Sequence, residues 1–425
     1  MLKTTPRAAL RLECSGCHAA APDGAWACSA CGALLEFVLA DREARVAIAA
    51  LLAARRGSND PLDRSGVWRF RELLPAIDPA SVVTLRENDL PLYEARRGAE
   101  YARAARVSYL HQGMNPTGSF KDGGMTVAIS DAKARAARIA VCASTGNTSA
   151  SMAAYAARAG MSALVIVPAT GISESKVAQT LDYGAKVIEI DGDFDAALRL
   201  VRRLDSRAVA LVNSVNPYRI EGQKCAAFVM LESRGWKAPD WLVLPGGNLG
   251  NASAYGKGLR EAHALGLIDR IPKIVVVQAS GAAPFVRALE SNTNLVAVKA
   301  QTSATAIKIG DPASWQKAKR EVLASGGCAL AVDDGEIADA RAVIGRDGVG
   351  CEPASAAALA GLRKLRERGT IGEDDDVVLV LTGHVLKDTA YAAAYHTSAA
   401  PFANRIVRAT SDLDAAALLR LAGVE

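Results

Sequence analysis

The chain has 425 residues, of which 50% are hydrophobic and 22% are charged, and its formal net charge is +5. This length exceeds that of most domains with a single hydrophobic core, and it predicts two to three domains. The basic residues are scattered rather than massed, which argues against a nucleic-acid-binding protein and only weakly favours small anionic substrates. No apolar stretch near the start has the length of a signal peptide or a membrane span, so we expect a cytoplasmic protein.

A cysteine cluster with little helical periodicity lies in residues 12–37. It contains two C-x2-C pairs, and four thiolates on two turns form a closed tetrahedral zinc site of structural type. Two disulfides or four free thiols are the alternative, which a cytoplasmic location disfavours. We expect a zinc ribbon with the ligands Cys14, Cys17, Cys28 and Cys31. The remaining cysteines are expected to be buried free thiols, namely Cys142, Cys225, Cys328 and Cys351.

Helical and extended patterns follow in alternation. Residues 41–56 are Ala-rich and predict a short helix, which Gly57 and Ser58 would end. From about residue 60, β-branched runs alternate with Ala-rich helical runs, and this predicts an α/β architecture with largely parallel sheets. The β-branched runs are Ile139–Cys142, Ala163–Val167, Lys186–Ile190, Ala208–Val212, Trp241–Leu244, Ile274–Gln278 and Val377–Leu381.

Residues 115–124 are an unusual segment in front of a predicted helix. Pro116 and Gly118 indicate a turn, which places Lys121 at or near the start of the helix. Burial and the positive helix N-terminus would both disfavour the charge of this lysine. A neutral amine is the form that Schiff-base chemistry needs. A lysine at a helix start is usually an ordinary lysine, so the prediction depends on the loops that accompany it.

Three further loops follow predicted strands, where open α/β sheets bind ligands. Residues 245–251 form a Gly-rich turn into a helix, which can present several backbone N–H groups to one anion. Residues 143–149 offer four hydroxyls, more than helix capping alone would use. Thr382 follows the last predicted strand, and by itself it indicates almost nothing. The alternative for each loop is a simple strand–helix turn.

Taken together and in order, these segments resemble the fold-type II pyridoxal-phosphate (PLP) enzymes, and among them the threonine synthase family. The resemblance runs from about residue 12 to residue 390, and a four-cysteine ribbon also occurs at the start of many threonine synthases. The matching segments are Ser65–Arg69, Asn115–Asp122, Ala143–Thr148, Asn213–Lys224, Pro245–Asn251, Ala304–Ile307 with Pro312–Trp315, Glu352–Ala356 and Leu381–His384.

The resemblance implies a fold and an organisation. The fold would be like that of the tryptophan synthase β-subunit, with two α/β domains and the cofactor in the cleft between them. A homodimer is also common in this family. The implied domains are a zinc ribbon at 1–40, a large PLP-binding domain at 41–124 plus 226–400, a smaller α/β domain at 125–225, and a C-terminal extension at 401–425.

The resemblance also implies roles for individual residues. Lys121 would form the Schiff base with PLP and later move protons. Asn147 would bond the cofactor's phenolic oxygen. Thr382 would face the pyridine nitrogen and, as a neutral hydroxyl, would leave it largely unprotonated. The cofactor phosphate would be held by Gly247, Asn248, Leu249, Gly250 and Asn251. The substrate carboxylate would be bound by Ser144, Thr145 and Thr148.

The features closest to threonine synthase are four residues that would bind the γ-phosphate of O-phosphohomoserine: Lys176, Asn213, Ser214 and Arg219. A dianionic phosphate needs Lys or Arg charge together with neutral donors, and arginine can bind it with two parallel hydrogen bonds. Solvated surface charges are the alternative for the two basic residues. The implied reaction is the conversion of O-phospho-L-homoserine and water to L-threonine and phosphate by γ-elimination and β-addition.

The sequence departs from the family pattern at several positions. Gly123 stands where arginine is usual after Lys-Asp, and Glu87-Asn88 stands where Glu-Gly is usual. Cys225 replaces a common threonine, and Val385 replaces a common glycine. These departures leave three alternatives open: a cysteate synthase acting on phosphoserine, a threonine or serine dehydratase, and a non-catalytic zinc-ribbon paralogue.

Overall fold

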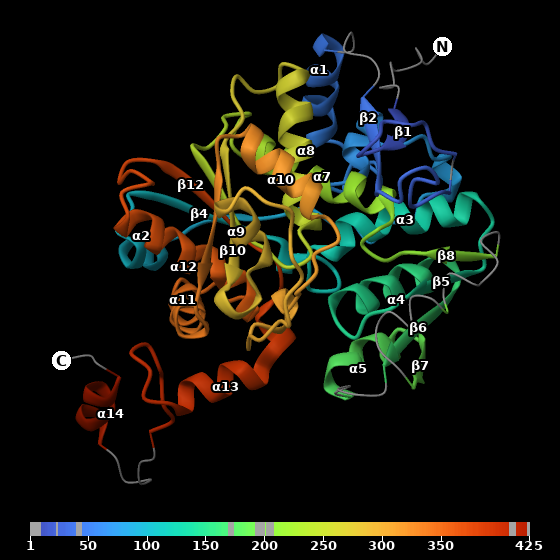
Figure 1. Ribbon diagram of the computed structural model, residues 1–425. Coiled ribbons are helices and arrows are strands. Elements are labelled where there is room, and N and C mark those ends of the chain that lie inside the picture. The colour runs from blue at the N-terminus through green and yellow to red at the C-terminus, as the bar shows by residue number, and fades with distance from the viewer. Residues whose placement is uncertain are drawn as a thin grey trace.

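Two mainly parallel β-sheets with covering helices form the body of the protein (Figure 1). The computed structural model describes residues 10–22, 24–39, 45–168, 174–191, 200, 208–407 and 414–422. All seven predicted strands are present, each within two residues of its expected ends. The expected α/β architecture is therefore confirmed.

The larger sheet has six strands. In sheet order these are β11 (Cys328–Val332), β10 (Lys273–Ala279), β9 (Trp241–Pro245), β12 (Asp376–Leu381), β4 (Arg106–His111) and β3 (Leu92–Glu94). All neighbours are parallel except β3 with β4. Side chains of the central strands alternate between two cores, with Leu242 and Leu244 in one and Val243 in the other. Because both faces are buried, these strands are continuous hydrophobic runs.

Helices cover both faces of the larger sheet. One core contains side chains of α2 (Arg96–Ala102), α11 (Asp334–Arg346) and α12 (Pro353–Glu367). The opposite core contains side chains of α8 (Gly250–Ala264), α9 (Pro284–Glu290) and α10 (Trp315–Ala324). The carboxyl ends of β9 and β12 are left free to carry the Gly-rich loop and Thr382.

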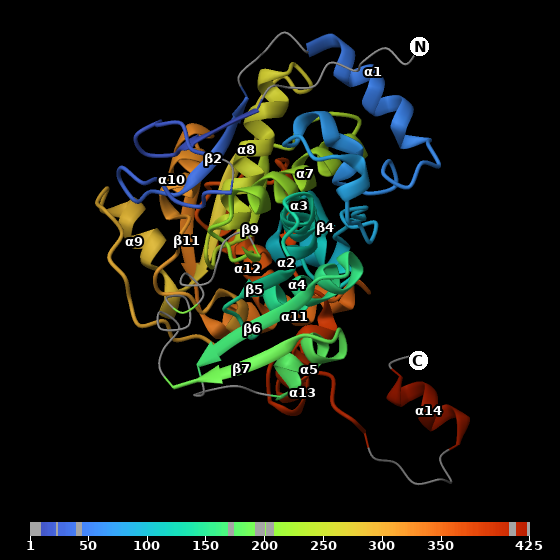
Figure 2. The same cartoon turned by 90° about the vertical axis from the view of Figure 1, so that its right-hand side faces the viewer.

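The smaller sheet has four parallel strands. In sheet order these are β7 (Lys186–Ile190), β6 (Ser162–Pro168), β5 (Ile139–Cys142) and β8 (Val209–Leu211). Helix α4 (Asn147–Ala159) leaves the end of β5, and α5 (Glu174–Asp182) packs against α4. Figure 2 shows β6 and β7 at the front of this part of the molecule, away from the larger sheet.

Helices α3 (Lys121–Ala134) and α7 (Pro217–Ser233) pack closely against each other. A Cβ atom at Gly222 would lie 1.8 Å from the carbonyl oxygen of Gly123, and one at Gly124 would lie 2.7 Å from that of Arg219, so Gly222 and Gly124 allow the two backbones to approach. This contact fixes the start of α3 against α7. Lys121 and Arg219, which lie on these two helices, are thereby held in one region.

The N-terminal ribbon consists of β1 (Leu10–Cys14) and β2 (Leu35–Leu39), which pair antiparallel, and α1 (Arg45–Arg56) follows. The side chain of Phe37 packs edge-on against Tyr218 of α7, with ring centroids 4.9 Å apart. Of the dispersed cysteines, Cys142, Cys225 and Cys351 are buried, Cys328 is partly buried, and all four are free thiols.

The chain ends in two short helices, α13 (Thr389–Thr397) and α14 (Ala415–Leu421). Figures 1 and 2 both show α14 standing apart from the body of the molecule. Within the described ranges, no helix combines the length and the apolar character that a membrane crossing requires.

Candidate active site

A cavity of about 800 Å³ is lined by residues that the two sheets and their helices contribute. It brings together most of the residues predicted from the sequence. The predicted residues in its wall are Lys121, Ser144, Asn147, Thr148, Asn213, Ser214, Arg219, Gly247, Asn248, Leu249, Gly250, Asn251 and Thr382. Thr145 is partly exposed and is not among the lining residues. Lys176 lies on α5, but its side chain is outside the described part of the structure.

Lys121 is the first residue of α3, as expected, and a rigid turn precedes it. Asp122 accepts hydrogen bonds from the Thr117 amide at 2.7 Å and from the Thr117 and Ser151 hydroxyls at 2.6 Å each. The Phe120 amide donates to the Thr382 carbonyl at 2.9 Å, which joins this turn to the end of β12. The lysine is thus fixed between α3, α4 and the larger sheet.

The Lys121 ammonium is destabilised by its surroundings. Burial, followed by the positive charge of Arg219, lowers its pKa to about 7, and the carboxylate of Glu352 opposes this shift. Its Nζ atom lies 3.8 Å from the centroid of the Phe120 ring. A substantial fraction of Lys121 is therefore a neutral amine near neutral pH, which carbonyl chemistry requires.

The Gly-rich loop turns β9 into α8. Leu249 has a left-handed backbone with φ of 63°, and a Cβ atom at Gly246 would lie 2.4 Å from the Val276 side chain. The Asn248 amide accepts from the Ala313 backbone N–H at 2.7 Å and donates to the Ser214 hydroxyl. The first N–H groups of the 15-residue helix α8 have no intrahelical acceptor, so this loop can bind a phosphate.

The loop before α4 meets a carboxylate that has no role in the sequence-based prediction. Asn147, the first residue of α4, donates through Nδ2 to Glu352 Oε2 at 3.0 Å. Thr382 donates through Oγ1 to Glu352 Oε1, also at 3.0 Å. Burial raises the pKa of Glu352, while hydrogen bonds from Asn147 and Thr382 and the charges of Lys121 and Lys387 oppose the increase. Glu352 therefore joins the two predicted ring-binding residues.

A second cationic region of the cavity surrounds Arg219. This arginine is only 1% exposed, its Nη1 atom donates to the Val212 carbonyl at 3.3 Å, and its Nε atom has no partner. Burial lowers its pKa to about 10, so the guanidinium stays charged at neutral pH. An unpaired buried donor of this kind suits an anion. Ser214 lines the same cavity and accepts a hydrogen bond from Asn248.

Asn213 is held more tightly than expected. Its amide accepts from the Ala143 N–H and donates to the Ala143 carbonyl, both at 3.1 Å. One N–H of this amide remains for a ligand, because a side-chain amide carries two donors. Asn213 thus fastens the end of β5 beside the cavity.

Lys387 and Gln179 are two further lining residues that the sequence did not indicate. The Lys387 ammonium donates to Gln179 Oε1 at 2.5 Å, and Gln179 donates to the Thr117 carbonyl at 3.1 Å. These bonds connect α5 with the segment after β12. Neither residue belongs to a motif recognised in the sequence. Lys387 lies three residues after the end of the Leu381–His384 segment.

The four N-terminal cysteines form a compact cluster outside the cavity. Their sulfur atoms all lie within 4.8 Å of one another, with Cys14–Cys31 at 3.4 Å and Cys17–Cys28 at 3.6 Å. Tetrahedral zinc with Zn–S bonds of about 2.3 Å separates sulfurs by about 3.8 Å, whereas a disulfide requires about 2 Å. The donor set therefore fits one zinc ion.

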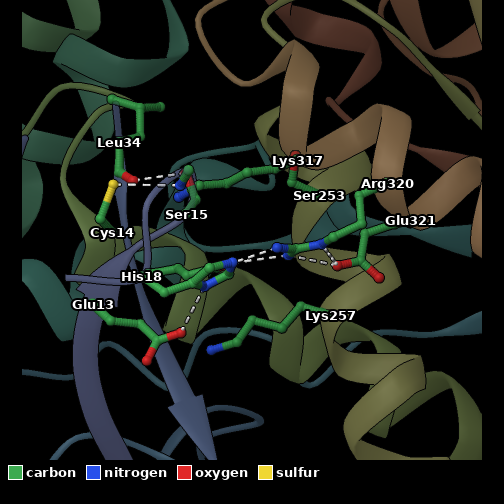
Figure 3. A network of polar contacts seen from close by, with 12 residues as sticks. Glu13, Cys14, Ser15, His18, Leu34, Ser253, Lys257, Lys317, Arg320 and Glu321 are labelled. Atoms are coloured by element: carbon green, nitrogen blue, oxygen red, sulfur yellow. Dashed lines mark hydrogen bonds and ion pairs between the residues drawn. The ribbon is translucent and has the colours of Figure 1, made fainter. Parts of the chain in front are cut away.

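The ribbon that carries these cysteines docks on α10. Lys317 is buried and donates to the Leu35 carbonyl at 2.6 Å, and Arg320 forms two bonds with Glu36 at 2.7 and 2.8 Å. Figure 3 shows Glu13 and His18 of the ribbon on one side and Lys317 and Arg320 on the other. The ribbon is thus a fixed part of the body.

Comparison with known proteins places this cavity in a class of enzymes. The pattern of the pyridoxal-phosphate dependent enzyme family matches residues 83–383, which include Lys121, Asn147, the Gly-rich loop and Thr382. The chain is thus a PLP-dependent enzyme. Threonine synthase of Methanosarcina acetivorans is 47% identical over 326 residues, which cover 76% of this chain and 80% of that protein. Threonine synthase of Methanocaldococcus jannaschii is 41% identical over 362 residues, 84% of this chain and 88% of that protein. Within the class, the chain belongs to the threonine synthase family, whose members are lyases.

Solved structures show the same fold at much lower identity. Threonine deaminase isoform 2 of Solanum lycopersicum superposes with a TM-score of 0.62 at 18% identity, over 80% of this chain and 93% of that one. Diaminopropionate ammonia lyase of Escherichia coli has a TM-score of 0.62 at 16% identity, over 82% and 96%. At this identity the similarity concerns the fold, and it confirms the fold-type II architecture.

Proposed function

We propose that this enzyme converts O-phospho-L-homoserine and water to L-threonine and phosphate. The observation that supports the proposal is a cavity that combines two features for anions, the N-terminus of α8 and the buried guanidinium of Arg219, with a lysine that has a lowered pKa. Two phosphates, one from PLP and one from the substrate, can then be bound at the same time. A dehydratase would need only the first.

The residues fit PLP. Lys121 offers the amine, residues 247–251 offer backbone donors for its phosphate, and Asn147 and Thr382 would meet the ring. A Cβ atom at Gly247 would lie 3.1 Å from the Ala306 carbonyl oxygen, so the loop passes close to its neighbours without a side chain. Bound there, PLP would supply an electron sink that makes the Cα–H bond of the amino-acid substrate acidic.

The protein side chains would carry out the remaining work. Ser144, Thr145 and Thr148 would orient the substrate carboxylate, and the Lys121 amine would remove the Cα proton and then relay a proton from Cβ. Lys176, Asn213, Ser214 and Arg219 would hold the γ-phosphate as it leaves Cγ. Water then adds at Cβ, and the phosphate held by Arg219 would accept its proton. Closure of the smaller domain would exclude water until that step.

The proposal includes an organisation for the chain. Residues 1–40 would form the zinc ribbon, 41–124 plus 226–400 the large domain, 125–225 the smaller domain and 401–425 an extension. The ribbon would bind one structural zinc, and the enzyme would be a cytoplasmic homodimer. Cysteines at metal-ligand spacing support the location, because in reducing compartments such pairs bind metal rather than form disulfides.

The test is a direct assay. Purified protein loaded with PLP is mixed with O-phosphohomoserine, and released phosphate and threonine are measured together. Equal amounts of both products support the proposal. Unphosphorylated homoserine should react poorly because it lacks the phosphate and hydroxide is a worse leaving group. Product formation from phosphoserine and sulfite, without threonine from phosphohomoserine, would contradict the proposal.

A further inference from the structure

Glu352 occupies a position that the proposed mechanism does not use. It is 4% exposed, it precedes α12, and its backbone N–H donates to the Gly383 carbonyl at 3.0 Å. A Cβ atom at Gly383 would lie 2.3–2.5 Å from the carboxyl group of Glu352. The absence of a side chain at position 383 thus leaves the space in which this carboxyl group reaches the cavity.

The hydroxyl groups beside Glu352 have a defined hydrogen-bond direction. Ser355 Oγ accepts from the Thr382 N–H at 2.8 Å and from the Gly383 N–H at 3.1 Å. A serine hydroxyl has two acceptor sites and one donor, so its proton goes to Thr382 Oγ1, which lies 3.0 Å away. Thr382 in turn donates its only hydroxyl proton to Glu352. The direction is Ser355 to Thr382 to Glu352.

This direction conflicts with a neutral ring nitrogen facing Thr382. If Glu352 is ionised, Thr382 donates its hydroxyl proton to Glu352. Thr382 can then offer the ring nitrogen only a lone pair, and an unprotonated nitrogen needs a donor. A neutral Glu352 can instead donate to Thr382. Thr382 then accepts from Ser355 and from Glu352, and its own proton becomes available to the nitrogen. Every donor and acceptor of this group is satisfied in that arrangement.

We propose that Glu352 is a positioning residue that takes up a proton when PLP binds and thereby turns the Thr382 hydroxyl toward the ring nitrogen. The inference rests on the proposed role of Thr382 in the PLP site. The proton comes from solvent, and no bond other than O–H of the carboxyl group is formed. Asn147 donates to the other carboxyl oxygen in the unliganded site, and its second amide proton is free for the cofactor.

The charges around Glu352 favour this uptake. Lys121 and Lys387 are the cations that face it, and both stabilise its ionised form in the unliganded site. At about pH 8 the Lys121 amine is already largely neutral, since its pKa is about 7. The charge that PLP adds to the cavity is its phosphate dianion, and this negative charge makes a carboxylate at position 352 less favourable.

Calorimetry of PLP binding tests the inference. Unliganded protein is titrated with PLP at about pH 8, above the usual range of carboxyl pKa values, in two buffers that differ in ionisation enthalpy. The wild type should take up about one more proton per chain than Glu352→Gln, whose amide is always neutral. Glu367→Gln, a half-exposed residue at the other end of α12, is the matched control and should behave as the wild type.

Two spectroscopic readouts locate the proton. The infrared spectrum of the PLP-loaded wild type should show the carbonyl band of a protonated carboxyl group, which shifts in D2O and is missing in Glu352→Gln. The visible absorption maximum should be the same in both, because the glutamine amide can donate to Thr382 as the neutral acid does. If the variant does not fold, the infrared band of the wild type alone decides.

Three results would overturn the inference: equal proton uptake in wild type and variant, no carboxyl band, or a shifted absorption maximum in the variant, which would place the proton on the ring nitrogen. A failure of the proposed function would look different. In that case the wild type would bind no PLP at Lys121, or would load PLP and release no threonine.

Discussion

The side chain of Asn88 fills the space beside Gly123 at the start of α3. A Cβ atom at position 123 would lie 2.6 Å from Asn88 Nδ2. Asn88 has a left-handed backbone with φ of 60°, a conformation in which the usual glycine of the family is the easiest residue and asparagine is among the tolerated ones. The two positions are both departures from the family pattern, and they are in contact. The Asn88 side chain occupies the space that a side chain at position 123 would need.

This contact predicts a paired effect. Gly123→Arg alone should lower the free energy of unfolding by about 1–3 kcal/mol, because the new side chain collides with Asn88 in a buried place. In an Asn88→Gly background, Gly123→Arg should lower the free energy of unfolding by clearly less. Urea unfolding of the two single variants and the double variant measures the coupling. Additive effects would show that the two residues do not share this space.

The lowered pKa of Lys121 predicts the pH dependence of PLP attachment. Its pKa of about 7 lies below the usual lysine value of 10.5, so the reactive neutral amine is lost below pH 7 and dominates above it. The attachment rate, followed by absorbance after mixing with PLP, should rise up to about pH 8 and then level off. Arg219→Gln should move the midpoint to higher pH, because the charge of Arg219 lowers the pKa of Lys121.

Borohydride reduction followed by peptide mapping checks that Lys121 is the attachment site. Lys121→Ala should lose the lysine-linked absorbance. Lys387→Met is the matched control, since Lys387 also lines the cavity, and it should still be labelled on Lys121. Label on any other lysine would disprove the assignment.

Arg219 should matter for turnover of the substrate and not for whether PLP occupies its site. Arg219→Ala is expected to lower kcat/KM for O-phosphohomoserine roughly 100-fold, since a charge-assisted contact to phosphate is lost, while PLP still binds. Arg363→Ala removes an arginine that is 43% exposed and pairs with Glu367, and it should leave kcat/KM unchanged. Near-normal turnover in Arg219→Ala would rule out its role in phosphate binding.

The cysteine cluster should contribute to stability and not to the chemistry. Cys14→Ser is expected to remove zinc and to lower the free energy of unfolding by at least about 2 kcal/mol, because a metal site of this type stabilises its own fold. The turnover of the remaining folded enzyme should be nearly unchanged, as none of the four cysteines lines the cavity. Metal analysis and thermal unfolding measure this, with Cys328→Ser as the control. A wild type without zinc would contradict the prediction.

The sequence predicts the central strands and the loops at their ends because those features have local signals. Trp241–Leu244 is a hydrophobic run bounded by a Gly-rich turn, and β9 has these bounds to within one residue. β4 was not predicted, since Arg106–His111 mixes polar and apolar residues and forms a strand through its neighbours β12 and β3.

The cavity residues also fall into two groups, those that belong to local motifs and those that only long-range contacts bring together. Lys121 and the Gly-rich loop belong to recognisable motifs. Glu352 lies in a segment that matches the family, but its contacts with Asn147 and Thr382 join positions that are 205 and 30 residues away. Lys387 and Gln179 are 208 residues apart. Such contacts depend on how the two sheets pack, which local patterns do not contain.

The ribbon precedes its docking site by a long distance along the chain. Lys317 binds the carbonyl of a residue 282 positions earlier, and Arg320 binds one 284 positions earlier. At about 5–20 residues per second, a ribosome needs roughly 15–60 seconds to make that interval. During this time the ribbon has no surface on α10 to rest on, and its four thiolates are what can keep it folded. With the proposed zinc site, a shortage of zinc would therefore impair the assembly of newly made chains, while enzyme that is already complete would continue to work.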